Sequence, residues 1–66
     1  MTGEELKAYR QARGLTQKAL GLKLGYPKNS AEKVVQQWEY DRQPIPIKHF
    51  RKLSGILDIP LEKFIP

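Results

Sequence analysis

The chain has 66 residues and a formal net charge of +5, from 12 basic and 7 acidic residues. It has no cysteine, which excludes disulfides and thiolate metal sites, and its single histidine, His49, lacks the carboxylate partners that a metal site would need. No apolar run approaches the roughly 18 residues of a membrane span, and the opening MTGEELK is acidic rather than typical of a signal peptide. We therefore expect one small, soluble, intracellular domain, residues 1–66.

Two helical segments are predicted in the first 25 residues, out of five in the whole chain, and no segment predicts a strand. The first helix starts at a capping box formed by Thr2 and Glu5 and ends at Gly14, which can adopt the left-handed conformation. The second starts at the N-cap Thr16 and ends at Gly25. Leu6, Tyr9 and Ala12 or Arg13 keep a helical period in the first helix, and the buried face of the second would be Ala19 or Leu20 with Leu24.

Three further helical segments are predicted after a break at residues 26–27. The third begins at a second capping box, formed by Asn29 and Glu32, and runs to about Tyr40. The fourth begins at Pro46, because proline suits the first turn of a helix, and a short last turn follows it. Ile47, Phe50, Leu53 and Leu57 line the fourth helix at helical spacing, and the last turn contains Leu61 and Phe64.

The positive charge is concentrated in the middle of the chain. Residues 7–52 contain eleven of the twelve basic residues but only three acidic ones, a surplus of eight charges. Such a segment favours a polyanionic partner through counterion release. A solvated, lysine-rich surface without a nucleic-acid partner would have the same composition, so charge alone does not separate the two interpretations.

The second and third helices have the properties of a pair that presents one helix to a DNA groove. Gly21 lies within a helix, where glycine costs about 1 kcal/mol relative to alanine, and close approach of the third helix would explain it. Val35 and Trp38 would form the inner face of the third helix. The outward side chains would be Lys33, Gln36 and Gln37. Glutamine can bind adenine and lysine can reach guanine in the major groove, although both are equally typical of a solvated helix face.

A Leu-Thr-Gln sequence opens the second helix and Trp-Glu closes the third, and the two together are a fairly specific combination. They fall within RQARGLTQKALGLKLG (10–25) and VVQQWE (34–39), which are followed by RQPIP (42–46) and KLSGILDIPLEKF (52–64). These stretches resemble the lambda-repressor/Cro-like (Xre-type) helix-turn-helix family over nearly the whole chain. The resemblance implies a compact all-α, five-helix DNA-binding domain. In it, Gln17 would contact phosphate or brace a recognition-helix side chain, residues from about 30 to 37 would face base edges, and Arg42 would touch the DNA backbone.

Three features depart from the family pattern. Trp38 comes thirteen residues after Gly25, where the family has about nine, so four extra residues, nearly one helical turn, either lengthen the recognition helix or enlarge the turn before it. Asp41 and Asp58 stand where glycine commonly ends a helix, which we expect to cost some stability without changing the fold. Leu22 falls where the family is polar. It is either an isolated exposed leucine, a contact to the enlarged turn or part of a contact surface.

No set of residues predicts catalysis, a metal site, a cofactor site or a small-molecule site. Glu4 and Glu5 are adjacent and so diverge on a helix, which they cap rather than forming a catalytic pair. His49 is expected on the polar surface of the fourth helix, where no catalytic partner is evident. The glycines of the second helix do not form a phosphate loop, because no Gly-Lys-Ser/Thr follows them. The stripe of Ile45, Ile47 and Phe50 is expected to be core rather than a ligand pocket.

We therefore predict a sequence-specific double-stranded DNA-binding protein. It would be a small phage-type or prokaryotic repressor or regulator that occupies its operator in the cytoplasm or nucleoid. We expect a homodimer on a pseudo-palindrome with half-sites about 34 Å apart. The C-terminal residues Ile56, Ile59, Phe64 and Ile65 would either form the dimer surface or complete the core. The expected base-reading residues are Asn29, Ser30, Lys33, Gln36 and Gln37, and the expected phosphate contacts are Gln17, Lys18, Lys28 and Arg42.

Two other functional classes fit parts of the sequence. A protein-interaction module, for example an antitoxin-like adaptor, would keep the helix-turn-helix fold without specific DNA binding, and it would tolerate Glu32 and Val34 in exposed positions. A non-specific nucleoid or RNA-binding protein would show little preference between duplex sequences. The basic residues Lys28, Lys33 and Arg42 around the third helix favour the DNA-reading interpretation.

Overall fold

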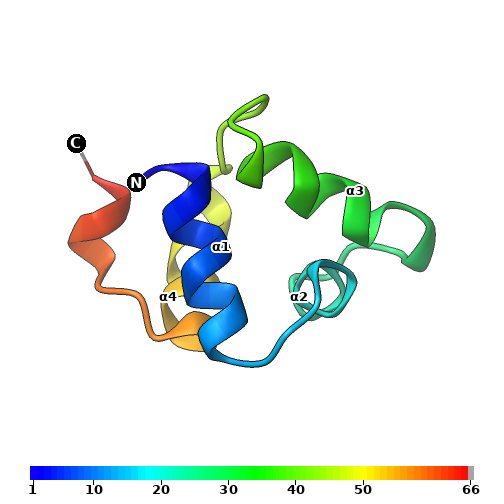
Figure 1. Cartoon of the computed structure of the whole chain (residues 1–66), viewed down its shortest axis with the longest axis horizontal. Helices are drawn as coiled ribbons and strands as arrows, with labels where there is room; N and C mark the ends of the chain where they lie inside the picture. The colour runs from blue at the N-terminus through cyan, green and yellow to red at the C-terminus, as the bar shows by residue number, and fades with distance from the viewer. Residues whose placement is uncertain (66) are drawn as a thin grey trace.

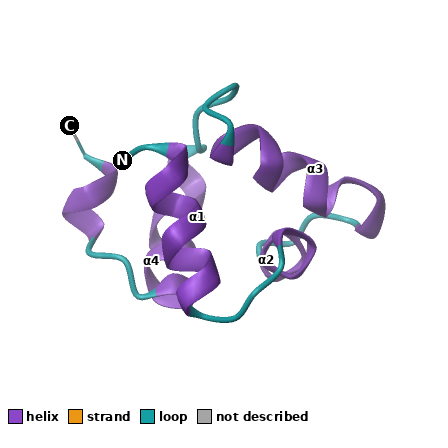
Figure 2. Ribbon diagram, in the orientation of Figure 1, coloured by secondary structure: helices purple, strands orange, loops and turns teal. Residues whose placement is uncertain are grey.

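The computed structural model describes residues 1–65, and Pro66, the last residue of the expected domain, lies outside the described residues. Residues 1–65 form four α-helices and two 3-10 helices, without a strand (Figures 1 and 2). The elements are α1 (Gly3–Ala12), α2 (Gln17–Lys23), α3 (Lys28–Glu39), η1 (Ile47–His49), α4 (Phe50–Leu57) and η2 (Leu61–Phe64). The all-α prediction is confirmed. The expectation of five helices is wrong, because the last segment is a short 3-10 turn between Pro60 and the extended Ile65.

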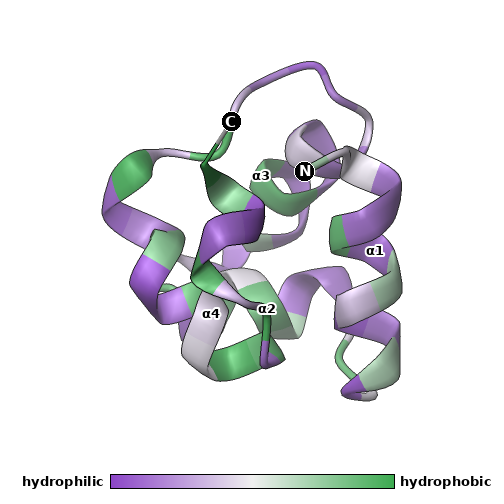
Figure 3. Ribbon diagram, turned by 90° about the vertical axis from the view of Figure 1, so that its left-hand side faces the viewer, coloured by the Kyte–Doolittle hydropathy of each residue, from purple (hydrophilic) through white to green (hydrophobic). Residues whose placement is uncertain are grey.

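The helices surround one hydrophobic core. In Figure 1, α2 is seen nearly end-on while α3 runs across the view above it, and the two cross closely. α1 packs against α3, and α4 packs against both 3-10 helices. Hydrophobic and hydrophilic residues alternate along the helices in Figure 3, as expected for helices that each bury one face. The buried apolar side chains are Leu6, Leu20, Leu24, Ala31, Val35, Trp38, Leu53, Leu57 and Ile59.

The caps of the first two helices follow the sequence signals. The Thr2 hydroxyl accepts from the Glu5 backbone N–H at 3.2 Å, and the Thr2 N–H donates to the Glu5 carboxylate at 2.9 Å. The bond to the Thr2 N–H, together with nearby Lys63, lowers the pKa of Glu5. The Thr16 hydroxyl accepts from the Ala19 N–H at 3.0 Å. Gly14 and Gly25 then end these helices in the left-handed region, with φ of 69° and 99°.

The start of α3 differs from the sequence prediction. Pro27 is the N-cap, and its carbonyl accepts from the backbone N–H groups of Ser30 and Ala31 at 3.0 and 2.9 Å. The predicted capping box of Asn29 and Glu32 is therefore wrong, since Asn29 already lies inside the first turn. The helix is 12 residues long and only residues 24–27 separate it from α2. The four extra residues thus lengthen the helix rather than the turn.

The second half of the chain contains two departures from the expected core. Ile47 is 81% exposed and is not a core residue, whereas His49 is only 7% exposed and is not a surface residue. Both follow from η1, because a 3-10 turn has three residues per turn and rotates these side chains away from the positions that an α-helix would give them. Asp41 and Asp58 both adopt φ of 58°, as expected for residues that replace a helix-ending glycine.

Candidate nucleic-acid interface

The crossing of α2 and α3 depends on Gly21. A Cβ atom at this position would lie 2.6 Å from the carbonyl carbon of Ala31 and would overlap its carbonyl oxygen. No side chain larger than hydrogen fits there without moving one helix, so Gly21 sets how closely α2 can support α3. The close approach expected from the sequence is confirmed, and the contact lies on the first turns of α3.

The inner face of α3 is apolar and fully covered. Ala31 and Val35 are 0% exposed and Trp38 is 4% exposed, at helical spacing. Val34 is half-buried and packs against the same core. The residues predicted to support the third helix, Val35 and Trp38, therefore lie where the sequence placed them.

The opposite face of α3 carries a stripe of polar side chains. At 100° per residue, Asn29, Lys33, Gln36 and Tyr40 follow one another along the side that points away from the core. Tyr40 was not singled out in the sequence, although its spacing of four from Gln36 was the signal that would have found it. The exposed members are Asn29, Lys33 and Tyr40, with Lys28 and Glu32 exposed beside them, and Ser30, Gln36 and Gln37 are half-buried.

A buried ion pair anchors the C-terminal end of this stripe. The Arg10 guanidinium donates to the Glu39 carboxylate at 2.6 Å and 3.2 Å, and the two side chains are 9% and 1% exposed. Arg10 also donates to the Leu15 carbonyl at 2.8 Å. The sequence interpretation missed this pair. The available signal was the position of Arg10, four residues after the buried Leu6 and hence on the inner face of α1.

The ion pair continues into the predicted site through two glutamines. The Gln17 side-chain amide donates to Glu39 at 3.0 Å, and its carbonyl accepts from the Gln36 amide at 3.1 Å. Gln36 is therefore held in one orientation by a chain of hydrogen bonds that ends at Arg10. Of the two roles that the family resemblance implied for Gln17, the geometry supports the bracing of a recognition-helix side chain.

The turn after α3 brings Arg42 next to Tyr40. The Arg42 guanidinium carbon lies 5.5 Å from the centre of the Tyr40 ring, and the Arg42 N–H donates to the Gln37 carbonyl at 2.9 Å. The other predicted phosphate contacts, Lys18 and Lys28, are exposed at the starts of α2 and α3. Lys28 and Arg42 thus lie at the two ends of the polar stripe.

An aromatic cluster of Tyr26, Trp38 and His49 joins the turn before α3 to its last turn. The three rings lie 5.4 to 6.0 Å apart in tilted or edge-on arrangements, and the Tyr26 hydroxyl is 2.8 Å from His49 Nε2. Burial lowers the pKa of His49, and the neighbouring Lys48 and Lys52 act in the same direction. The buried histidine is therefore a structural contact beneath α3 in a neutral form.

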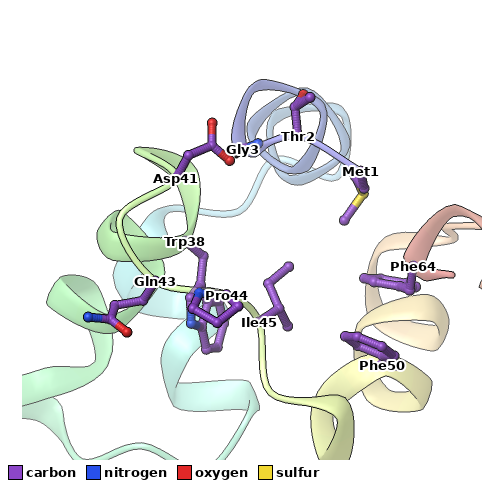
Figure 4. A pocket seen from close by; sticks show the side chains of 10 residues that line it. All are labelled: Met1, Thr2, Gly3, Trp38, Asp41, Gln43, Pro44, Ile45, Phe50 and Phe64. Atoms are coloured by element: carbon purple, nitrogen blue, oxygen red, sulfur yellow. Dashed lines mark hydrogen bonds between the residues drawn. The ribbon is translucent and has the colours of Figure 1, made fainter. Parts of the chain in front are cut away.

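A cleft of about 210 Å³ opens beside this cluster (Figure 4). Its walls come from the first three residues, the turn after α3, α4 and η2, and the stacked rings of Phe50 and Phe64, 4.8 Å apart, form one side. Across residues 1–65, no group of three or more histidine, aspartate or glutamate residues could hold a metal ion. In the same range, no helix is long and apolar enough to cross a membrane.

The chain belongs to the helix-turn-helix family, since the model of that family, described as "Helix-turn-helix", matches residues 6–64. This confirms the resemblance to lambda-repressor-like regulators and identifies a helix-turn-helix protein rather than an enzyme. The crystal structure of the transcriptional regulator BswR is similar, with a TM-score of 0.89 and 30% sequence identity. The match covers 100% of this chain and 65% of that protein. No curated protein matches the sequence.

Proposed function

We propose that the chain binds double-stranded DNA sequence-specifically and regulates transcription by occupying an operator. The observation that carries this proposal is the polar stripe of α3, which is free on the outside and locked from the inside by Gly21 and the Arg10–Glu39 pair. A recognition helix needs both properties, because base edges in the major groove are read only by side chains held at a fixed depth and angle. Family membership and the similarity to a transcriptional regulator support the same conclusion.

The base-reading residues would come from the exposed side of α3. Gln36 has an unused amide hydrogen and a free carbonyl after its bond to Gln17, so it can still form a bidentate contact with adenine. Lys33 can reach guanine, and Asn29 can read adenine from the added N-terminal turn. Ser30 and Gln37 complete the proposed set of base contacts.

Exposed basic residues of α2, of the start of α3 and of the turn after α3 would bind phosphate. Lys18, Lys28 and Arg42 are exposed, and each neutralised phosphate releases counterions and adds to the salt dependence of binding. The added turn of α3 places Lys28 and Asn29 beyond the close contact with α2. We therefore infer a contact at the edge of the groove that a shorter recognition helix would lack.

The proposed operator is a pseudo-palindrome bound by two copies, with half-sites about 34 Å apart. Ile65 is 65% exposed and Leu61 is 45% exposed, which makes the C-terminal segment a candidate surface for pairing. Ile59 is 2% exposed and belongs to the core, and Ile56 and Phe64 are half-buried. In this proposal the chain forms a single DNA-binding domain, which acts as a repressor in the cytoplasm or nucleoid.

Selection from a random duplex library tests the proposal. We expect a defined preferred sequence, and we expect Gln36→Ala and Gln37→Ala each to relax it at one or two positions, at about 1–3 kcal/mol per bidentate contact. Lys18→Ala and Arg42→Ala should weaken binding to all duplex sequences by a similar factor. Each should also reduce the dependence of affinity on salt concentration. Lys7→Ala is the matched control, because it removes from α1 one exposed charge that is unpaired among residues 1–65, outside α2, α3 and the C-terminal segment proposed for pairing. A selection that yields no preferred sequence contradicts the proposal.

A second candidate function, a protein-interaction module, is favoured by one observation. Glu32 is exposed on α3 without an ion-pair partner among residues 1–65, and a carboxylate there repels phosphate. Val34, which an adaptor would expose, is instead packed against the core. If the chain is a protein-interaction module, neither the wild type nor Glu32→Gln should bind duplex DNA. In the DNA-binding proposal, Glu32→Gln should strengthen binding to most sequences.

A further inference from the structure

The turn after α3 is folded back onto the helix and held at several points. The backbone N–H groups of Arg42 and Gln43 both donate to the backbone carbonyl of Gln37, at 2.9 and 3.3 Å. Asp41 adopts a left-handed conformation with φ of 58°, which reverses the chain after Tyr40. The segment from Tyr40 to Gln43 therefore has one defined conformation rather than an open loop.

The side chain of Asp41 ties this turn to α1. Its carboxylate accepts from the Gly3 N–H at 2.9 Å, across 38 positions of sequence (Figure 4). Gly3 is itself packed on the last turn of α3, because a Cβ atom there would overlap the Glu39 carbonyl and lie 2.8 Å from the Trp38 carbonyl oxygen. A glycine in place of Asp41 would allow the same backbone turn but would leave this hydrogen bond unmade. The Asp41–Gly3 bond thus explains the departure from glycine at this position.

The turn presents the cation–π pair of Tyr40 and Arg42 to solvent. The Arg42 guanidinium lies over the Tyr40 ring at 5.5 Å, and the Tyr40 side chain is 59% exposed at the end of the polar stripe of α3. Neither of the two ion pairs of residues 1–65 involves Arg42. Stacking on an aromatic face leaves the N–H edges of a guanidinium free, and those edges match two oxygens of a phosphate group.

We infer that Tyr40 is a positioning residue that holds Arg42 for a bidentate phosphate contact, and that the Asp41–Gly3 bond fixes the turn that carries both. The inference rests on the proposed DNA binding. Tyr40 lies on the same face as Gln36, so the contact falls on the backbone beside the base pairs that α3 would read. Lysine could supply the charge of Arg42 but not the two-point phosphate contact of a planar guanidinium.

A double-mutant cycle tests the coupling between Tyr40 and Arg42 on the duplex selected by the wild-type chain. Tyr40→Ala and Arg42→Lys should each weaken binding about three- to fivefold, and Tyr40→Phe, which keeps the ring, should bind like the wild type. The double variant Tyr40→Ala/Arg42→Lys should bind about as weakly as Arg42→Lys alone, because the second change removes an interaction that is already lost. None of these variants should alter the base preference, and Tyr40→Ala and Arg42→Lys should leave the salt slope near the wild-type value.

A matched pair of variants tests the role of Asp41. Asp41→Asn introduces a residue that tolerates the left-handed region and keeps a side-chain carbonyl for the Gly3 N–H, whereas Asp41→Gly keeps the backbone turn and loses the bond. Both variants remove the negative charge, so their difference reports the side-chain bond together with the greater backbone freedom of glycine. We expect Asp41→Gly to bind DNA at least about twofold more weakly than Asp41→Asn.

The outcomes separate this inference from the proposed function. If the wild-type chain binds no duplex, both are overturned. The wild-type chain could instead bind a defined sequence while the double variant loses affinity by the full product of the two single losses, or while Tyr40→Ala changes the preferred base at one position. Either result overturns the positioning role of Tyr40 and leaves DNA binding standing. Equal binding by Asp41→Asn and Asp41→Gly overturns the role of the Asp41–Gly3 bond.

Discussion

The C-terminal end of α3 is held by polar side chains from two other helices, whereas its N-terminal end has no side-chain cap and packs closely against α2. At the C-terminal end, Glu39 pairs with Arg10 and Gln17, and Trp38 is buried in the core. At the N-terminal end, the first turn has no side-chain cap and lies against Gly21 through Ala31. The aromatic cluster, in which the rings of Tyr26, Trp38 and His49 pack on one another, connects the turn before α3 to its last turn.

The difference shows how one fold can fix the orientation of the last turns of a helix while leaving its first turn free to vary. Side chains in the last two turns of α3 are positioned by contacts that extend into α1, so their orientation is set by the body of the protein. Side chains in the added first turn depend on a helix end that is supported from one side. For the proposed DNA contact, positions are therefore best counted back from Trp38, which is buried in the core.

The largest expected effect comes from breaking the C-terminal anchor. Glu39→Ala leaves the Arg10 guanidinium buried without its partner, which should reduce the free energy of unfolding by about 3–5 kcal/mol in urea titrations. Glu32→Ala is the matched control, since this carboxylate is exposed on the same helix and its loss should change stability by less than about 0.5 kcal/mol. The double variant Arg10→Met/Glu39→Met should recover much of the loss. A loss below about 1 kcal/mol for Glu39→Ala would contradict the anchoring role.

The N-terminal end should respond to a change at its close contact with Gly21. Gly21→Ala places a methyl group against the Ala31 backbone and should destabilise the fold by about 1–3 kcal/mol, measured by thermal unfolding. Gly55→Ala provides the comparison, because a Cβ atom there meets nothing within 4 Å. It should stabilise α4 by up to about 1 kcal/mol through helix propensity. If the two alanine variants have the same stability, close approach does not explain Gly21.

A smaller effect should follow when the bracing of Gln36 is removed. Gln17→Ala deletes the hydrogen bonds to Glu39 and Gln36 and should cost about 1 kcal/mol of stability. It should also broaden the base preference at the position read by Gln36, because that side chain is no longer held in one orientation. Selected duplexes would be compared with those of Gln11→Ala, a change on the exposed surface of α1. A Gln17→Ala variant with unchanged preference would show that Gln36 needs no brace.

The smallest effect is expected from pH, through the cluster that joins the two ends. Burial lowers the pKa of His49 below its usual 6.5, so the folded chain binds this proton less readily than the unfolded chain. The contribution of neutral His49 to stability is therefore complete above 6.5 and is lost as the pH falls below that value. Unfolding free energies at about pH 7.5 and 5.5 should differ less for His49→Gln than for the wild type. An equal pH dependence in both proteins would contradict the assignment.

The parts of the fold that were predicted from sequence depend on neighbours close in the chain. The capping box of Thr2 and Glu5 and the helix-ending glycines are set by residues within one turn. Gly21 was informative because glycine destabilises a helix interior and therefore needs a packing reason. The close contact with the Ala31 backbone is that reason. The polar stripe of α3 followed from the position of Trp38, which fixes the inner face of the helix.

The parts that were missed depend on partners far apart in the chain. Arg10 and Glu39 are 29 residues apart, and neither charge predicts burial until the other is brought beside it. His49 is buried because Tyr26 and Trp38 arrive from two other elements. Ile47 is exposed because η1 replaces the expected first turn of α4 and changes the residue period locally. The N-cap at Pro27 was missed because proline offers a backbone carbonyl in place of a side-chain signal.

The length of the addition to α3 also limits how this helix could have changed during evolution. Four residues advance a helix by one turn plus about 40°, so the inner face stays close to its original direction. An insertion of two residues would rotate everything before it by about 160°, and Ala31 would no longer meet Gly21. Insertions and deletions in the first turn of α3 should therefore be tolerated in steps of three or four residues. Changes of this size would alter the reach of the reading surface while leaving the body of the protein unchanged.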